Sequence, residues 1–274
     1  MQIVPLHRDF GAEILDFDFR RGVTENEKNG LRQAFDRYQL LLIRSPGRLA
    51  PEQQVEFTSW FGQVSDNGTG AWSVLHNETV GGSRLLQFHS DFSYTESPIH
   101  AISLQGVELP AGGTATAFVS GVAAWADLPH DRRRQLEGMT LQHRYRAANN
   151  PDWPEFVADH PLCLRHPRTG APILYVTEHH ASGIQELTKE ESDRTIAELL
   201  AHLYAPARIY LHQWQLNDLV IWDNLAVQHA RPEAAEPSRG ARAMQRVAIN
   251  DVGLPKLIER ARQREARERH AVIG

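Results

Sequence analysis

Short apolar runs alternate with amphipathic segments along the first quarter of the chain. Residues 11–19 carry apolar side chains at close intervals, and residues 40–43 form a short, wholly apolar run. Both segments are strand-like, and the second is typical of a buried strand. Residues 25–38 and 51–61 instead repeat their apolar positions at helical spacing, and the second of these begins at Pro51 and is followed by a glycine. The pattern therefore predicts alternating strands and helices in this part of the chain.

Strand-like segments dominate from residue 85 onward. We expect strands at residues 100–107, 114–120, 141–145, 162–166, 173–176, 207–213, 219–222 and 245–250. We expect helices at residues 122–136, interrupted by Pro129, at 189–204, and in the charged C-terminal segment 254–274, whose Arg- and Glu-rich residues favour a solvated surface helix. Residues 66–83 are rich in Gly, Asn, Ser and Thr, which is typical of a loop.

Many short strands with a few helices at the periphery indicate a mainly β fold with flanking helices (α+β). The expected architecture is a β-sandwich or jelly roll covered by helices. The glycine pairs at residues 81–82 and 112–113 lack the context of a dinucleotide-binding or phosphate-binding loop, so a nucleotide site is only weakly indicated. A chain of 274 residues is long enough to bury a large core.

Composition narrows the function classes. The 29 basic and 34 acidic residues give a net charge of −5, so no global positive field is present to hold nucleic acid or an anionic membrane. Cys163 is the only cysteine, which excludes an intrachain disulfide and a Cys-rich zinc site. No apolar run reaches the length of about 18 residues that spans a bilayer. We therefore expect a cytoplasmic protein. The 14 histidines favour metal or proton chemistry.

The first candidate metal ligands are His89 and Asp91, which are separated by one residue. On a strand, residues two apart project from the same face, so one imidazole and one carboxylate can approach a single ion. This spacing arises easily by chance among 14 histidines and 34 acidic residues, and a surface polar pair is the alternative. His229, just after the predicted strand 219–222, supplies a third ligand. Two histidines and one carboxylate form the facial triad of non-haem Fe(II) oxygenases.

Several short motifs now make the chain resemble a known family. They are Gly11-Ala12-Glu13-Ile14, Phe61-Gly62, Phe88-His89-Ser90-Asp91, Gly112-Gly113-Thr114-Ala115-Thr116-Ala117-Phe118, His166-Pro167-Arg168-Thr169-Gly170, Trp222-Asp223-Asn224 with His229, and Arg242-Ala243-Met244-Gln245-Arg246. Because these motifs occur in the same order as in the family, the chain resembles the taurine dioxygenase and aryloxyalkanoate dioxygenase family, whose members depend on Fe(II) and 2-oxoglutarate. The resemblance implies a double-stranded β-helix (jelly-roll) core within a single dioxygenase domain over residues 1–274.

The resemblance also implies roles for individual residues. His89, Asp91 and His229 would bind iron. The sequence register places the family's threonine, which helps hold the distal carboxylate of 2-oxoglutarate, on Thr116, with Thr114 as the rival placement. Arg242 would form an ion pair with the same carboxylate, a task that suits a rigid guanidinium. Arg246, four residues further along the same strand, would meet an anionic group of the substrate.

Other positions concern the substrate pocket. The resemblance implies that the loop 66–87 and the segment 147–159, which match no family motif, form pocket walls. Trp72 and His76 lie in this loop, which would overhang the metal, and are candidate substrate contacts, with a purely structural role as the alternative. Phe88 replaces the Trp that is common before the first iron ligand, and Asn217 replaces a Gly before Asp218. Asn tolerates a left-handed backbone almost as Gly does, so the second change leaves the chemistry untouched.

Four further side chains have interpretations that involve no chemistry at the site. His179 and His180 are adjacent, so on a strand they face opposite ways and do not share a metal. His143 is expected to be a satisfied core histidine, and Cys163 a buried, inert thiol.

The expected function is an Fe(II)- and 2-oxoglutarate-dependent dioxygenase that takes O2. It would hydroxylate, desaturate or oxidatively cleave a small, anionic organic substrate and release succinate and CO2. Asp91 favours these outcomes over halogenation, since related halogenases replace the carboxylate with a small residue. One alternative within the class is a tailoring oxygenase that acts on an amino acid or natural-product intermediate. A zinc hydrolase would leave Arg242 and Thr116 without a purpose, and a non-catalytic iron or 2-oxoglutarate sensor would bind the same ligands without turnover. The sequence leaves the oligomeric state open, including a homo-oligomer.

Overall fold

The computed structural model describes the chain except for residues 45, 67, 69, 78–84, 148–149, 151, 234–239 and 274. Its largest sheet has seven strands in the order β1 (Gln2–Pro5), β2 (Ala12–Leu15), β3 (Leu40–Ile43), β14 (Leu219–Asp223), β6 (Ala101–Glu108), β16 (Ala243–Ile249) and β4 (Trp72–His76). Neighbouring strands are antiparallel, except that β2 and β3 run parallel. Two edge strands, β1 and β4, end this sheet, and Pro5 is tolerated on the first because an edge strand need not donate every hydrogen bond.

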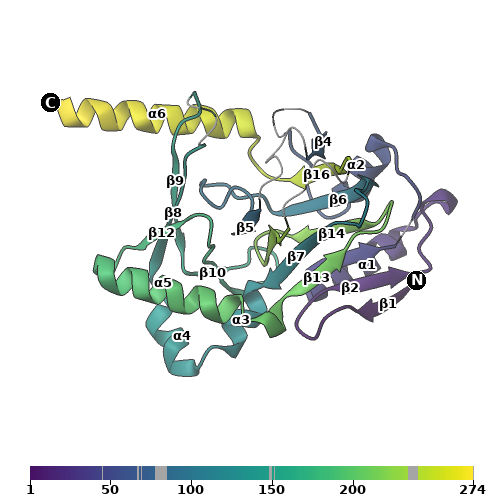
Figure 1. Cartoon of the computed structure of the whole chain (residues 1–274), viewed down its shortest axis with the longest axis horizontal. Coiled ribbons are helices and arrows are strands. Elements are labelled where there is room, and N and C mark those ends of the chain that lie inside the picture. Colours follow the sequence, from purple (N-terminus) through teal and green to yellow (C-terminus); the bar gives the residue numbers. More distant parts are fainter. Residues whose placement is uncertain are drawn as a thin grey trace.

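A second, four-stranded antiparallel sheet faces the centre of the first. Its order is β13 (Tyr210–Gln213), β7 (Ala115–Ser120), β15 (Val227–Arg231) and β5 (Leu86–His89). Apolar side chains from both sheets form one buried cluster, in which Leu104, Val220 and Met244 of the large sheet join Phe118 and Val227 of the small one. The two sheets therefore form a sandwich, whose strands are arranged as Figure 1 shows.

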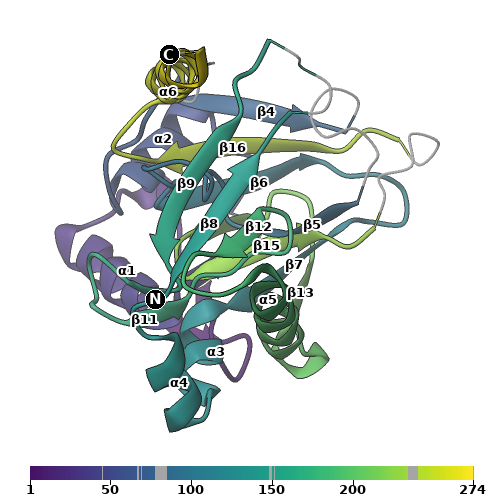
Figure 2. The same cartoon turned by 90° about the vertical axis from the view of Figure 1, so that its left-hand side faces the viewer.

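Two small sheets complete the β structure. One has the order β12 (Ala181–Ile184), β8 (Thr140–Tyr145) and β9 (Phe156–Pro161), and the other pairs β10 (Cys163–Arg165) with β11 (Pro172–Leu174). Figure 2 shows β8 and β9 running side by side as a long antiparallel pair. The turn between β10 and β11 includes Gly170, whose φ of 71° lies in the left-handed region that glycine accepts readily.

Helices cover the sheets from three sides. Helices α1 (Glu25–Tyr38) and α2 (Pro51–Ser59) bury Leu31, Phe35 and Phe57 in a cluster with the outer face of the large sheet. Helices α3 (Gly121–Asp127), α4 (His130–Leu136) and α5 (Lys189–Leu203) enclose another cluster below the small sheets. Helix α6 (Leu254–Ile273) packs through its first half onto β9 and then extends outward to the C-terminus (Figure 1).

The mainly β class with a few helices is confirmed, and two local expectations are corrected. Strand β4 lies inside the predicted loop 66–83, because an edge strand that pairs only with β16 can expose polar side chains and so lacks a clear apolar pattern. The predicted helix 122–136 is two helices, since the chain leaves helical geometry at Leu128 before Pro129. The segment 147–159 contains the start of β9, and its expected role as a pocket wall stays a prediction. No helix in the described part of the chain is long and apolar enough to span a membrane.

Candidate active site

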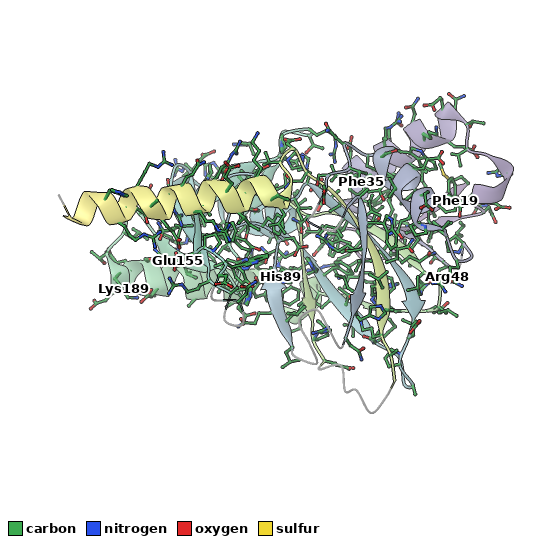
Figure 3. The ribbon with its side chains drawn as sticks, turned by 90° about the horizontal axis from the view of Figure 1, so that it is seen from above. Phe19, Phe35, Arg48, His89, Glu155 and Lys189 are labelled. Atoms are coloured by element: carbon green, nitrogen blue, oxygen red, sulfur yellow. The ribbon has the colours of Figure 1, made fainter. Side chains whose placement is uncertain are left out.

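Two neighbouring strands of the small sheet bring the predicted metal ligands together. His89 ends β5 and lies directly opposite His229 on β15, and Asp91 follows two residues beyond His89. Candidate ligand atoms of these three side chains all lie within 4.8 Å of one another. Asp91 Oδ1 is 3.3 Å from His89 Nε2 and 3.9 Å from His229 Nε2. The three residues that the sequence singled out therefore meet at one point, and Figure 3 places His89 near the middle of the molecule.

A buried asparagine fixes the backbone of Asp91. Asn224, in the turn between β14 and β15, accepts a hydrogen bond from the Asp91 amide at 3.0 Å and donates to the Asp91 carbonyl at 3.1 Å. Its side chain also donates to the carbonyl of Ile99 at 2.7 Å. The residue after Asp91, Phe92, has a φ of 61°, which is uncommon for a bulky residue. The carboxylate is thus presented by a tight turn that the neighbouring hairpin holds in place.

Burial and mutual charge set the protonation of the three side chains. Burial lowers the pKa of His229 to about 3, so this imidazole is neutral at physiological pH. Burial also lowers the pKa of His89, but the Asp91 carboxylate outweighs it and the net pKa is raised. Burial raises the pKa of Asp91, whereas His89, Arg246 and His229 together hold it well below its usual range. An ionised carboxylate beside a neutral imidazole is a donor set that binds divalent iron.

Arg246 contacts the same carboxylate from the other side. Its guanidinium donates to Asp91 Oδ2 at 2.8 Å, while Oδ1 remains directed at the two imidazoles. The side chains of Arg246 and Asp91 are 12% and 24% exposed, so this ion pair is largely shielded from water. The two carboxylate oxygens therefore have different partners.

The triad opens into a cavity of about 530 Å³ between the two sheets. Its apolar wall includes Ile102, Leu104 and Trp222, and its polar residues include Thr116, Arg231 and Arg242. Within the described residues, Arg242 donates from Nε to Thr114 Oγ1 at 3.3 Å and makes no ion pair with a carboxylate. Burial and the nearby Arg231 lower the pKa of Arg242 to about 10. A buried, charged guanidinium with a neutral partner is suited to an anionic ligand.

The two threonines have different positions at this end of the cavity. Thr116 lines the cavity and accepts a hydrogen bond from Trp214 Nε1 at 2.9 Å, which leaves its own hydroxyl proton available to a ligand. Thr114 instead contacts Arg242. The register that places the cosubstrate threonine on Thr116 is therefore compatible with the cavity, and Thr114 supports the arginine.

Of the two residues on β4 that were expected to contact substrate, His76 lines the cavity and Trp72 is absent from its described lining. Trp72 is 39% exposed. Arg231 is a cavity residue that sequence reasoning missed. The signal that would have found it is its position two residues after His229 on the same strand, which places both side chains on one face.

Three other interpretations have mixed outcomes. His179 and His180 lie in a turn before β12, not on a strand, and the described metal cluster excludes both. His143 is fully buried, but neither ring nitrogen has a hydrogen-bond partner in the described part of the chain, so it is not a satisfied histidine. Cys163 is buried, as predicted.

A further polar cluster anchors the hairpin behind the site. Asp223 accepts hydrogen bonds from the amides of Leu225 and Ala226 through Oδ1, while Oδ2 is 2.7 Å from His166 Nε2 and 3.0 Å from Arg168. The carboxylate is buried, and these partners hold its pKa below the usual value although burial opposes them. Asp223 thus shapes the turn that leads to His229.

Comparison with known proteins agrees with this geometry. Residues 2–248 match the family described as "Taurine catabolism dioxygenase TauD, TfdA family". The chain belongs to the TauD/TfdA family. It is therefore a 2-oxoglutarate-dependent dioxygenase, and the predicted use of Fe(II), 2-oxoglutarate and O2 is confirmed.

Individual members of the TauD/TfdA family are similar over most of their length. The chain is 31% identical over 261 residues to the alpha-ketoglutarate-dependent 2,4-dichlorophenoxyacetate dioxygenase of Burkholderia sp. (strain RASC), which covers 82% of this chain and 86% of that protein. It is 28% identical over 254 residues to pentalenolactone F synthase of Streptomyces arenae, with 80% and 85% covered. The crystal structure of a taurine dioxygenase from Burkholderia xenovorans matches with a TM-score of 0.80 at 26% identity, covering 91% and 90% of the two chains.

Proposed function

We propose that this TauD/TfdA enzyme holds iron through His89, Asp91 and His229 and binds 2-oxoglutarate between that metal and Arg242. The observation that carries the proposal is that one cavity joins three converging metal ligands to a buried arginine whose partner is neutral. The distal carboxylate would pair with Arg242 and accept a hydrogen bond from Thr116. Thr114 would orient the guanidinium.

The chain's own residues supply position and a dry environment. Bound iron supplies the reactivity toward O2 that the side chains lack. Neutral His229 and ionised Asp91 are already in their metal-binding forms at physiological pH. Ile102, Leu104 and Trp222 exclude water from the space beside the triad, which protects a reactive centre from side reactions. Arg242 fixes one end of the cosubstrate, so its other end is oriented toward the metal.

The substrate is proposed to be a small organic anion. Arg246 lines the cavity beside the triad, and His76 adds a second polar group on its wall. One guanidinium N–H is used on Asp91, and guanidinium has five N–H donors in total, so others remain for a sulfonate or carboxylate. Relatives named for 2,4-dichlorophenoxyacetate and for sulfate esters support this class. Hydroxylation, desaturation or cleavage after hydroxylation would each begin at a C–H bond held near the metal.

A tailoring reaction on a natural-product intermediate is the second candidate. It is favoured by the similarity to pentalenolactone F synthase, which extends over 80% of this chain. We further infer that the paired sheets form the double-stranded β-helix implied by the family, which is supported by the antiparallel order β13-β7-β15-β5 facing β14, β6 and β16.

The experiment is succinate formation from 2-oxoglutarate and O2 by anaerobically Fe(II)-loaded protein, with sulfonates, aryloxyalkanoates and amino acids as trial substrates. We expect one class to stimulate succinate release, and we expect His89→Ala to abolish it. His179→Ala is the matched control, since its ring lies 6.0 Å from that of His89 but outside the triad. Protein that binds iron and 2-oxoglutarate yet forms no succinate with any compound would contradict catalysis and favour a sensor.

A further inference from the structure

One tyrosine contacts both strands that carry the histidines of the triad, on the face of the small sheet that is turned away from them. Tyr204 directly follows α5, and its ring stacks on Phe88 with centroids 4.5 Å apart and an interplanar angle of 15°. Its hydroxyl donates to Gln228 Oε1 at 2.6 Å. Phe88 precedes His89 on β5, and Gln228 precedes His229 on β15. Adjacent residues of a strand project to opposite faces, so Tyr204 joins the two strands directly behind the histidines.

The backbone of residues 176–178 holds this contact in one geometry. Gln228, which is 2% exposed, donates from Nε2 to the carbonyl of Val176 at 2.7 Å. The amide of Glu178 donates to the Tyr204 hydroxyl at 3.1 Å. Burial raises the pKa of Tyr204, so the phenol keeps the proton that it donates to Gln228. The hydroxyl therefore both donates and accepts a hydrogen bond, which fixes its orientation.

Strand β5 benefits from support outside its own sheet because its pairing is short and irregular. It is an edge strand of the small sheet, and its pairing with β15 places His229 opposite His89 and Arg231 opposite Leu86, with a register shift between the two pairs. On its other side, β15 pairs with β7 at four consecutive positions. An irregular ladder constrains the relative position of two strands less tightly than a regular one.

We propose that Tyr204 is a positioning residue for the metal centre, because it joins Phe88 to Gln228 and so sets the separation of His89 and His229. The two imidazole rings have centroids 4.3 Å apart. Metal binding depends on ligand distances to within about 0.2 Å, so a small shift of β5 against β15 weakens it. The inference rests on the proposed function, because it takes His89 and His229 as ligands of one metal ion.

The test measures the metal site without turnover. Co(II) is titrated into the metal-free full-length protein, and the visible absorption of bound Co(II) reports the number and arrangement of its ligands. Tyr204→Phe keeps the ring on Phe88 and removes the hydroxyl. We expect it to weaken Co(II) binding about tenfold, since groups that orient metal ligands typically contribute about 10–100-fold to affinity, and to shift the absorption bands. Tyr204→Leu removes the stacked ring as well and should cause a larger loss.

His202→Ala is the matched control on the same helix. His202 lies on α5 and donates from Nε2 to the carbonyl of Ala124 on α3 at 2.8 Å, so its loss loosens α5 away from β5 and β15. We expect this variant to change Co(II) affinity less than about twofold, with the spectrum of the wild type. Urea unfolding of each metal-free protein identifies conditions in which all variants are folded, and Tyr204→Phe alone decides the test if Tyr204→Leu does not fold.

The remaining outcomes separate this inference from the proposed function. Wild-type affinity and spectrum in Tyr204→Phe would overturn the positioning role. Equal losses in Tyr204→Phe and His202→Ala with an unchanged spectrum would also overturn it, because general packing of α5 would then explain the effect. Wild-type protein that binds no Co(II), or a His89→Ala variant that keeps wild-type affinity and spectrum, would instead overturn the assignment of the metal ligands.

Discussion

The two ends of the cavity satisfy their charges in different ways. At the metal end, Asp91 and Arg246 form an ion pair, and Asp91 also contacts both histidines. At the far end, the side chain of Arg242 contacts the neutral Thr114, with Arg231 close by. One end is balanced by an ion pair, whereas at the other end Arg242 makes no ion pair with a carboxylate within the described residues.

This difference separates the tasks of the two ends. A balanced, hydrogen-bonded site keeps its geometry before any ligand arrives, which suits metal ligands. A site that is short of negative charge gains most when an anion enters, which suits the recognition of a cosubstrate. Arg242 directly precedes β16 and Arg246 lies on it, and the two side chains are chemically identical, so their different roles follow from their positions and partners.

The sharpest test of the comparison is Arg242→Met. We expect the half-saturating 2-oxoglutarate concentration to rise about 100-fold, because loss of a buried charged partner typically costs about 2–5 kcal/mol. Iron affinity should stay within about threefold, since Arg242 does not contact the triad in the described chain. Both are measured by anaerobic titration. A comparable loss of iron affinity would show that the two ends are not separate.

The support behind the metal end is tested by Asp223→Asn. We expect a loss of about 2 kcal/mol in the free energy of unfolding at pH 7, from breaking a buried charged network. The pKa of Asp223 is lowered in the folded protein, so its contribution is fully present above the unfolded pKa and declines as pH falls through the folded value. Urea unfolding at pH 7 and below pH 4 should therefore show the gap between wild type and variant closing in acid. A gap that widens in acid would contradict this assignment.

The smallest expected effect concerns Arg246→Met. We expect stimulation of succinate release by an anionic substrate to weaken about tenfold in KM, the effect of about 1.4 kcal/mol. Half-saturation by 2-oxoglutarate should change less than about threefold, in contrast to Arg242→Met. Steady-state assays over both concentrations distinguish the two arginines. If both variants raised the half-saturating 2-oxoglutarate concentration equally, the two ends of the cavity would not have separate functions.

The metal end was accessible to sequence reasoning because its signals are local. His89 and Asp91 lie two residues apart at the end of a strand, and His229 comes soon after β14, whose residues are all apolar except its last one, Asp223. Arg242 and Arg246 belong to one short motif at the start of β16, in which Arg242 directly precedes the strand. Spacing and residue type were enough to predict that these five residues belong to one site, and all five line the same cavity.

Features that depend on register were harder to predict. Strand β4 has no clear alternation, and which of its side chains enter the cavity depends on its pairing with β16, so Trp72 was placed at the substrate and is not in the described lining. Arg231 lies outside every motif, and its place in the cavity lining is set by the pairing of β15 with β5, in which it lies opposite Leu86. Within the described residues, neither ring nitrogen of the buried His143 has a hydrogen-bond partner, and this too follows from tertiary packing and could not be predicted from sequence.

The pairing of β5 with β15 also has a thermodynamic consequence. Asp91 and His229 are 138 positions apart in the chain, and they meet only when the small sheet has formed. An unfolded chain offers no such site, so each increment of metal occupancy shifts the folding equilibrium toward the native state, by about 2.7 kcal/mol at 100 times the dissociation constant. The iron concentration would then set the fraction of protein that is folded, as well as the fraction that is catalytically active.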